Sequence, residues 1–210
     1  MGFNQHLKEK SKKLVNRFSL PTDQSLVRAA WTEFVVDNGK VHIKADLSLK
    51  QSRVILSPPL FGKKQVEKRT FLSESLAYVV VEQFATRLNY RIYKNAFRRF
   101  NKRLNIISCI EGGRVELRDD LIRREGESKR FHTHLLIELP KFEYLREGKN
   151  KIPFNEQLFM QIIEEEWIAT EWGYYENNIE RINSTELCSK YQTKYGFGSV
   201  DLRSTHINHN

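Results

Sequence analysis

The sequence predicts an α+β fold built around a mainly antiparallel sheet. Apolar residues recur with a period of two in some segments and at helical spacing in others, so strands and helices are mixed along the chain. These segments do not follow the regular β–α–β order that indicates a parallel sheet. An Asn-Gly pair between two apolar runs adds a hairpin signal.

Length and composition fit one globular domain with a basic surface. The chain has 210 residues, of which 40% are hydrophobic, and this is enough for a packed core. Lys and Arg number 35 against 26 Asp and Glu, so the formal net charge is +9. Such a surplus favours a polyanionic partner, either a nucleic acid or an anionic membrane surface.

No segment predicts insertion into a membrane. The basic N-terminal run lacks the apolar core of a signal peptide. The longest apolar stretch, Leu76 to Val81, is far shorter than the roughly 20 residues that span a bilayer. Cys109 and Cys188 lack the spacing of metal ligands, and we expect both to be reduced thiols. These features predict a cytoplasmic protein with no membrane partner.

The first 50 residues predict a loosely attached arm followed by a hairpin. Residues 1–24 are polar and basic. An apolar cluster, Trp31 to Val36, precedes Asn38-Gly39, and alternation then follows in Val41, Ile43, Ala45 and Leu47. Asn-Gly between two such runs is typical of a two-residue hairpin turn.

The rest of the chain predicts alternating strands and helices. The expected strands are Arg53–Leu56, Ile106–Ile110, Phe131–Leu139 and Tyr174–Ile182. The expected helices are Ser73–Leu88, a second helix or continuation over Asn95–Arg103, Pro153–Trp167, and a last helix from about Asn183 to Gly196. In that last helix, Asn183 and Glu186 have the spacing of a capping box, and Gly196 is a natural end.

The most informative motif is His132-Thr133-His134, inside a predicted strand. Side chains alternate between the two faces of a strand, so both imidazoles point the same way, roughly 7 Å apart. They can converge on one divalent cation, although a bare His-x-His more often marks a solvated sheet face. The spacing of His206 and His209 could also allow metal binding, but a disordered tail is the expected explanation there.

Glu111 ends the preceding predicted strand and is the candidate third ligand. If residues 112–130 form a long charged connection, Glu111 lies beside the histidines on the neighbouring strand. One carboxylate and two imidazoles leave positions open for water and phosphate oxygens, which suits Mn²⁺ or Mg²⁺ in phosphoryl transfer. Taken alone, such a glutamate is more often a surface carboxylate.

Tyr191, on the last predicted helix, is the candidate nucleophile. Lys194 follows three residues later and shares a side of that helix. A phenol has a pKa of about 10, so it needs a metal ion or another cation nearby to attack at neutral pH. Lys194 could supply this charge or steady a phosphate. Packing is the alternative role for any tyrosine, and Tyr195 could also face the site.

Together these residues resemble the HUH endonucleases, specifically the single-tyrosine rolling-circle replication initiators of plasmids, phages and related elements. His132-Thr133-His134, the upstream Glu111 and Tyr191-Gln192-Thr193-Lys194 follow the family's order. The resemblance implies a five-stranded antiparallel sheet flanked by helices, with both histidines on its central strand. It also implies a metal ion at the three ligands, and attack of Tyr191 on single-stranded DNA to leave a 5′-phosphotyrosine and a free 3′-hydroxyl.

The resemblance also divides the chain. It covers roughly residues 53–205, so we expect residues 1–50 to be a basic arm and extension and residues 51–210 to be the endonuclease domain. The family's first motif, a strand rich in Thr and apolar residues, has its best candidate in Val54-Ile55-Leu56-Ser57. Leu187 stands where some relatives carry a second catalytic tyrosine, which favours a single nucleophile.

The stretch from Arg87 to Arg103, which contains no acidic residue, is the candidate DNA-binding surface. If it is helical, Tyr90, Tyr93, Phe97, Phe100 and Leu104 form an inward stripe. A solvated basic helix explains this pattern fully, but beside a nuclease motif the cations become a track for phosphates. The cations expected on this track are Arg87, Arg91, Lys94, Arg98, Arg99 and Lys102.

The expected activity is metal-dependent, site-specific nicking and joining of single-stranded DNA, which initiates rolling-circle replication of a mobile element, plasmid or phage. The expected partners are single-stranded DNA or an origin hairpin and, since the sequence has no Gly-rich phosphate loop of a helicase, a helicase of the bacterial host cell. A relaxase or HUH transposase would use the same residues. A non-cutting origin-binding protein with this fold and an unrelated metallohydrolase are two competing hypotheses.

Overall fold

A five-stranded antiparallel sheet organises the structure, a computed structural model that describes residues 24–56, 67–112, 131–193 and 200–207. The strand order is β8-β1-β5-β4-β9. The strands are β1 (Ile43–Leu49), β4 (Ile106–Glu111), β5 (His132–Ile137), β8 (Gly173–Arg181) and β9 (Val200–His206). The predicted α+β class and its antiparallel sheet are therefore confirmed, and the histidine strand β5 is the central one.

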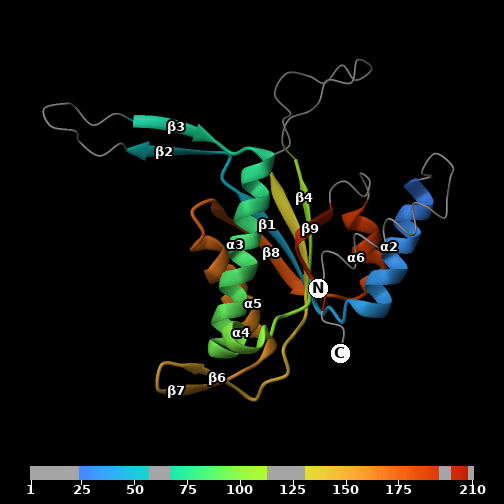
Figure 1. Ribbon diagram of the computed structural model, residues 1–210, viewed down its shortest axis with the longest axis vertical. Coiled ribbons are helices and arrows are strands. Elements are labelled where there is room, and N and C mark those ends of the chain that lie inside the picture. The colour runs from blue at the N-terminus through green and yellow to red at the C-terminus, as the bar shows by residue number, and fades with distance from the viewer. Residues whose placement is uncertain (1–23, 57–66, 113–130, 194–199, 208–210) are drawn as a thin grey trace, which may run out of the picture.

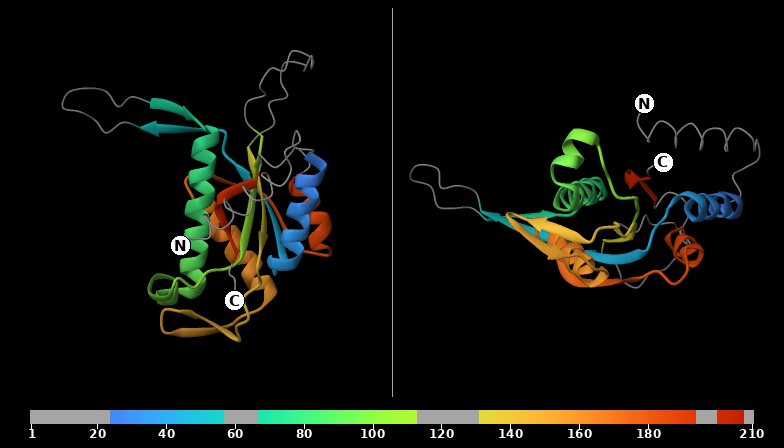
Figure 2. Two further views of the ribbon diagram at one scale, coloured as in Figure 1. Left: turned by 45° about the vertical axis from the view of Figure 1, so that its right-hand side comes forward. Right: turned by 90° about the horizontal axis from the view of Figure 1, so that it is seen from below.

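Helices cover both faces of this sheet (Figures 1 and 2). The long helix α3 packs with α5 on one face, while α2 and α6 lie side by side over the other. The helices are α2 (Gln24–Asn38), α3 (Glu74–Tyr93), α4 (Asn95–Phe100), α5 (Glu156–Ile168) and α6 (Thr185–Gln192).

The larger core lies between the sheet and the helices α3 and α5. Alternate residues of β1, such as Ile43 and Leu47, are fully buried against it. Phe84 of α3 meets Trp167 of α5 edge to face, with ring centroids 5.3 Å apart. The Trp167 indole nitrogen also donates a 2.9 Å hydrogen bond to the Ser48 carbonyl oxygen, which ties α5 to β1. The two helices therefore fix the position of the central strands.

The opposite face is divided into an apolar part and a polar part. Trp31 and Val35 of α2 pack against Ile107 and Leu136 in a smaller core. Farther along the same face, β5 carries His132 and His134, which point to the same side of the strand as Leu136. The side chains around these histidines are polar. The candidate site lies in this polar part.

The predicted hairpin at Asn38-Gly39 is wrong, because the segment before it is the helix α2. The Gly39 amide donates to the Val35 carbonyl oxygen at 2.8 Å, and the chain then turns at Lys40 with a φ of 46°. A Cβ at position 39 would lie 2.5 Å from that same oxygen, so glycine is required by close packing at the helix end. Asn-Gly here ends a helix.

The strand β1 also belongs to residues 1–50, the segment expected to be an extension, but it lies inside the sheet between β8 and β5. It pairs with β5 from Ile43 opposite Ile137 to Ser48 opposite His132. The sheet therefore starts before residue 51. The predicted arm, residues 1–24, lies outside the described residues except for its last position.

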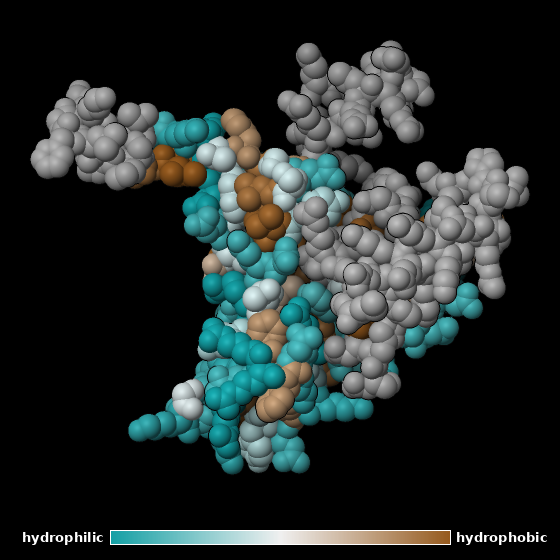
Figure 3. Space-filling model, viewed as in Figure 1, coloured by the Kyte–Doolittle hydropathy of each residue, from teal (hydrophilic) through white to brown (hydrophobic). Residues whose placement is uncertain are grey.

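The strand β2 (Ser52–Leu56) was predicted, but it pairs with β3 (Glu67–Phe71) in a ribbon separate from the sheet. This ribbon projects from the body and carries exposed apolar side chains (Figure 3), namely Val54, Ile55, Leu56 and Phe71. Val54-Ile55-Leu56, our candidate for the family's first motif, is therefore not a strand of the sheet, and its last residue, Ser57, lies outside the described residues.

The remaining elements agree with the predictions to different degrees. The helices α3 and α5 and the strands β4 and β8 occur where periodicity predicted them. The last helix is shorter than expected, because Ser184 caps its start and Thr193 caps its end, while Gly196 lies outside the described residues. The structure adds β9 and the hairpin of β6 (Tyr144–Glu147) and β7 (Asn150–Pro153).

Two general features concern the membrane and the cysteines. Among the described residues, no helix is both long enough and apolar enough to cross a bilayer. Cys109 is buried and Cys188 is half-buried, and neither forms a disulfide. The reduced cysteines agree with the expectation from the sequence.

His206 corrects another expectation, because it lies in β9 and not in a disordered tail. It pairs with Ile106 of β4, whereas His209 lies outside the described residues. Burial, together with the Arg103 guanidinium 3.5 Å away, lowers the pKa of His206 to about 4. The folded protein therefore resists protonation of this ring, whereas the unfolded chain takes up the proton near pH 6.5.

We predict that His206 makes the fold acid-sensitive. Its contribution to stability is complete above pH 6.5, the ordinary pKa, and is lost as the pH falls towards 4, by roughly 3 kcal/mol. His206→Gln removes this loss. In urea unfolding, the difference in stability between wild type and variant should stay constant above pH 7 and shift by that amount in favour of the variant in acid. Parallel pH profiles would contradict the prediction.

Candidate active site

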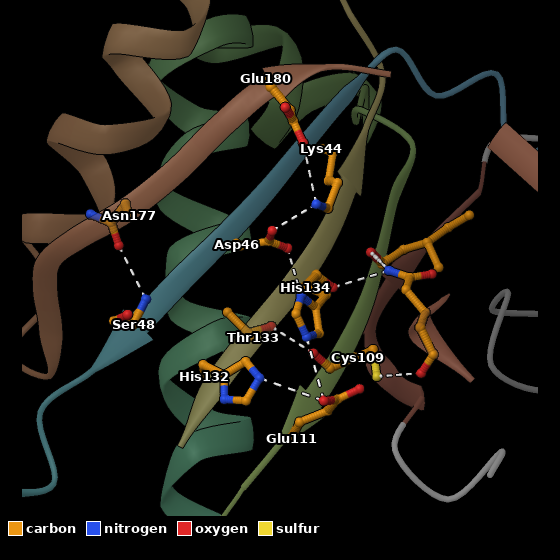
Figure 4. A network of polar contacts seen from close by, with 12 residues as sticks. Lys44, Asp46, Ser48, Cys109, Glu111, His132, Thr133, His134, Asn177 and Glu180 are labelled. Carbon is orange, nitrogen blue, oxygen red and sulfur yellow. Dashed lines mark hydrogen bonds and ion pairs between the residues drawn. The ribbon is translucent and has the colours of Figure 1, made fainter. Parts of the chain in front are cut away.

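Pairing of β4 with β5 brings the three predicted metal ligands together (Figure 4). Glu111 is the register partner of His132, and Cys109 is the partner of His134. The Nε2 atoms of both histidines lie 3.5 Å from the same Glu111 oxygen, Oε2. One ligand atom from each residue lies within 4.8 Å of the others. This group can bind a metal ion.

The distances suit an ion better than they suit direct hydrogen bonds. A separation of 3.5 Å exceeds the usual hydrogen-bond range of roughly 2.7–3.2 Å. Two ligand atoms this far apart and each about 2.1 Å from one ion subtend roughly 110° at it, a common coordination angle. The His134 Nε2 atom is buried and has no hydrogen-bond partner of ordinary length among the described residues. A cation between these atoms would satisfy it.

Asp46 fixes the orientation of the buried His134 ring. Its carboxylate lies 2.5 Å from Nδ1 of His134 and accepts a hydrogen bond from the N–H group there, which directs the Nε2 lone pair towards Glu111. Burial lowers the pKa of His134, but contacts with Asp46 and Glu111 outweigh burial and raise it above the ordinary value. The same carboxylates that favour a proton on this ring also favour a metal cation beside it.

Lys44 extends this polar network along β1. Its ammonium lies 2.8 Å from Asp46 and 3.2 Å from Glu180 of β8. Burial lowers the pKa of Lys44, but the two carboxylates outweigh burial and raise it, so the side chain stays charged. The network in Figure 4 thus contains three carboxylates, from Asp46, Glu111 and Glu180, and one ammonium. This excess of negative charge attracts a dication.

The candidate nucleophile lies beside the metal ligands. The Tyr191 ring meets the His134 ring edge to face, with centroids 5.1 Å apart. Tyr191 is 46% exposed, so its ring can be reached from solvent, and the Lys44 ammonium lies 5.8 Å from the ring centroid. Lys194 and the second candidate nucleophile, Tyr195, lie outside the described residues.

Gln192 anchors α6 over the sheet and thereby places Tyr191. Its buried amide nitrogen donates to the carbonyl oxygen of His134 at 3.0 Å. The Cys109 thiol donates to the Gln192 carbonyl oxygen at 2.9 Å. These contacts join the residue after the candidate nucleophile to the two strands that carry the metal ligands. The position of Tyr191 relative to His134 is therefore set by buried contacts.

The predicted basic track does not lie with these residues. The helix α3, which carries Arg87 and Arg91, packs on the opposite face of the sheet. Arg87 pairs with Glu166 at 3.0 Å, and Arg91 contacts Glu147, Glu165 and Glu166. Two of the six expected cations are thus neutralised by acidic residues of α5 and β6.

The other four cations lie at the end of α3, in α4 and just after it. Lys94 and Arg98 lie over the Tyr90 ring, Lys102 lies over the Tyr93 and Phe142 rings, and Arg99 is exposed. The predicted inward aromatic stripe is wrong for two of its members, since Tyr90 is 39% and Phe100 79% exposed. The helix is broken at Lys94, where φ is 49°, so one continuous stripe cannot form. DNA binding by these cations stays a prediction.

Lys44 and Asp46 were not predicted from the sequence, although a signal was present. The alternation of apolar residues in β1 leaves Lys44, Asp46 and Ser48 on the other face. A strand with three polar residues on one face is a candidate for lining a polar site. Which strand it would join could not be read from local pattern.

We predict that Mn²⁺ stabilises the protein through these ligands. At a hundredfold excess over the dissociation constant, a ligand that binds only the folded state adds about 2.7 kcal/mol to the unfolding free energy. His132→Ala and Glu111→Gln should abolish the shift in thermal unfolding, and EDTA should reverse it in the wild type. The matched control is His206→Gln, which should retain it. An equal Mn²⁺ shift in the two ligand variants would place the ion elsewhere.

Comparison with known proteins adds nothing to the evidence from the geometry of the site. No protein-family model, no curated protein and no solved structure matches this chain.

Proposed function

We propose that this protein is a metal-dependent endonuclease of the HUH type, which nicks and rejoins single-stranded DNA through Tyr191. One observation carries the proposal. The ring of Tyr191 packs against His134, which is itself one of three converging metal ligands. The candidate nucleophile and the candidate metal ligands thus lie side by side, and this supports the proposal because phosphoryl transfer to a tyrosine requires both together.

We propose Mn²⁺ or Mg²⁺ as the metal ion. Two imidazoles and one carboxylate favour an ion of borderline hardness and tolerate a hard one. His132 is the most exposed of the three ligands, with 30% of its side chain accessible against 5% for His134 and 3% for Glu111. His132 is therefore the ligand that solvent reaches most easily. When bound, the ion would polarise the phosphate under attack and offset the charge that develops on its oxygens.

The residues of the chain have distinct roles in this proposal. Glu111, His132 and His134 would hold the ion, and Asp46 keeps the His134 ring in position. The Tyr191 oxygen attacks phosphorus and loses its proton to solvent, so a phosphotyrosine bond forms as the bond to the 3′ oxygen breaks. The departing 3′ oxygen takes a proton and becomes a free hydroxyl. Because one phosphate ester replaces another, the reverse reaction can rejoin the strand without an added energy source.

The biological role that we propose is initiation of rolling-circle replication of a plasmid, phage or mobile element. Its substrate would be single-stranded DNA or an origin hairpin, and a helicase of the bacterial host would unwind the duplex. Four cations at or after the end of α3 are proposed to contact flanking phosphates, namely Lys94, Arg98, Arg99 and Lys102. A relaxase or HUH transposase would use the same chemistry on a different DNA.

We predict that the protein forms a covalent adduct with single-stranded DNA that survives denaturing gels. A randomised single-stranded library with Mn²⁺ supplies every possible target, and sequencing the trapped strands identifies the preferred site. Tyr191→Phe deletes only the attacking oxygen, so the adduct should vanish while DNA binding persists. EDTA should prevent adduct formation in the wild type.

Two further tyrosines serve as controls. Tyr175, 65% exposed on β8, is a matched surface tyrosine, and Tyr175→Phe should keep the adduct. An adduct that survives Tyr191→Phe but disappears in Tyr195→Phe would refute the assignment of the nucleophile. Cleavage without any adduct would indicate a metallohydrolase that uses water. Binding without cleavage, across several metals, would indicate the non-cutting origin-binding protein.

A further inference from the structure

Lys44 occupies an unusual position beside the candidate active site. It lies on β1, on the same face as His132 and His134, with Leu136 and Glu180 as its register partners on the two sides. Its ammonium is 2.8 Å from Asp46, 3.2 Å from Glu180 and 5.8 Å from the centre of the Tyr191 ring. It thus borders both the nucleophile and, through Asp46, the metal ligand His134.

The environment of this lysine differs from that of most lysines. Lysine side chains usually extend until the charge reaches bulk water. Only 21% of the Lys44 side chain is accessible, and its charge is held over the polar part of the sheet, as Figure 4 shows. Ordering a long side chain in this way costs conformational entropy, so another interaction must offset that cost.

Neutralisation of acidic residues does not offset this cost. Glu180 is 51% accessible, and an ion pair with such an exposed residue contributes little to stability. Asp46 is already paired with His134 at 2.5 Å. Neither carboxylate therefore relies on Lys44 alone, since Asp46 also contacts His134 and Glu180 is half-exposed. A DNA phosphate at this place would need a cation, because the neighbouring carboxylates repel it.

We propose that Lys44 is a phosphate-binding residue of the active site, which holds a phosphodiester oxygen of single-stranded DNA next to Tyr191. A phosphate that Tyr191 could attack must lie close to the Tyr191 ring, and the Lys44 ammonium lies 5.8 Å from the centre of that ring and contacts His134 only through Asp46. Its ammonium is a point charge that binds phosphate oxygens well. On binding, it exchanges the exposed Glu180 for the phosphate and keeps its contact with Asp46. This inference rests on the proposed function.

The test measures how a short fluorescent oligothymidylate binds in Mn²⁺ as the salt concentration rises. For single strands, each phosphate contact contributes about 0.7 to the slope of log affinity against log salt. Lys44→Met should flatten the slope by about that amount and weaken binding at low salt about ten- to a hundredfold. Lys44→Arg should keep the slope of the wild type. The control Lys151→Met removes the same charge from an exposed position in β7 and should leave the slope unchanged.

Two further measurements separate phosphate binding from a structural role. If Lys44 merely neutralises acids, Glu180→Gln should restore DNA affinity to the Lys44→Met protein, and restoration would overturn the proposal. We expect no restoration. Mn²⁺ affinity, measured by titration calorimetry, should not weaken in Lys44→Met. If Lys44→Met lowered the affinities for Mn²⁺ and for DNA together, Lys44 would act only through the metal site, and this result would also overturn the proposal.

Failure of this inference can be told apart from failure of the proposed function. If the wild type binds the oligothymidylate and Lys44→Met shows an unchanged slope, Lys44 makes no phosphate contact and only this inference is lost. If the wild type binds no single-stranded DNA, with or without Mn²⁺, both the nuclease and the role of Lys44 are contradicted.

Discussion

The register of β5 between β1 and β4 is the constraint on which the candidate site depends. It sets His132 opposite Glu111 and His134 opposite Asp46, so four polar side chains meet on one face. A slip of one residue would turn both histidines towards the core beneath α3 and α5. Burial prevents this slip, because Leu135 and Leu136 are almost fully buried on opposite faces of the sheet.

The face of the sheet that carries the histidines is only partly covered by helices, so it contains both a packed apolar part and an accessible polar part. Where α2 and α6 pack, buried contacts through Gln192 lock α6 onto the sheet. Where their cover ends, Tyr191 is exposed next to ionisable groups that would be costly to bury without partners. The carboxylates there carry more charge than Lys44 can balance, which favours a dication first and a phosphate second. The rigid apolar part thus positions a polar part that can bind ligands.

The spacing of apolar residues within short segments predicted individual helices and strands, but it could not predict which strands pair. The histidine strand, the buried strand ending at Glu111 and the helices α3 and α5 follow from periodicity within short windows. Pairing between β1 and β5 joins segments about 90 residues apart, so its neighbours Lys44 and Asp46 could not be found in this way. Asn38-Gly39 misled because the same residues suit a hairpin turn and a helix end. Arg91 is neutralised by acids of α5 and β6 that are distant in sequence.

The central claim is that Glu111, His132 and His134 bind one divalent ion beside Tyr191. Crystals of the wild-type protein grown with Mn²⁺ would test it directly through the anomalous scattering of the metal. We predict one strong anomalous peak about 2.0–2.2 Å from Oε2 of Glu111 and from the Nε2 atoms of both histidines. The peak should be absent in crystals of Glu111→Gln. An ion bound elsewhere, with these three side chains in direct contact and no peak between them, would contradict the account.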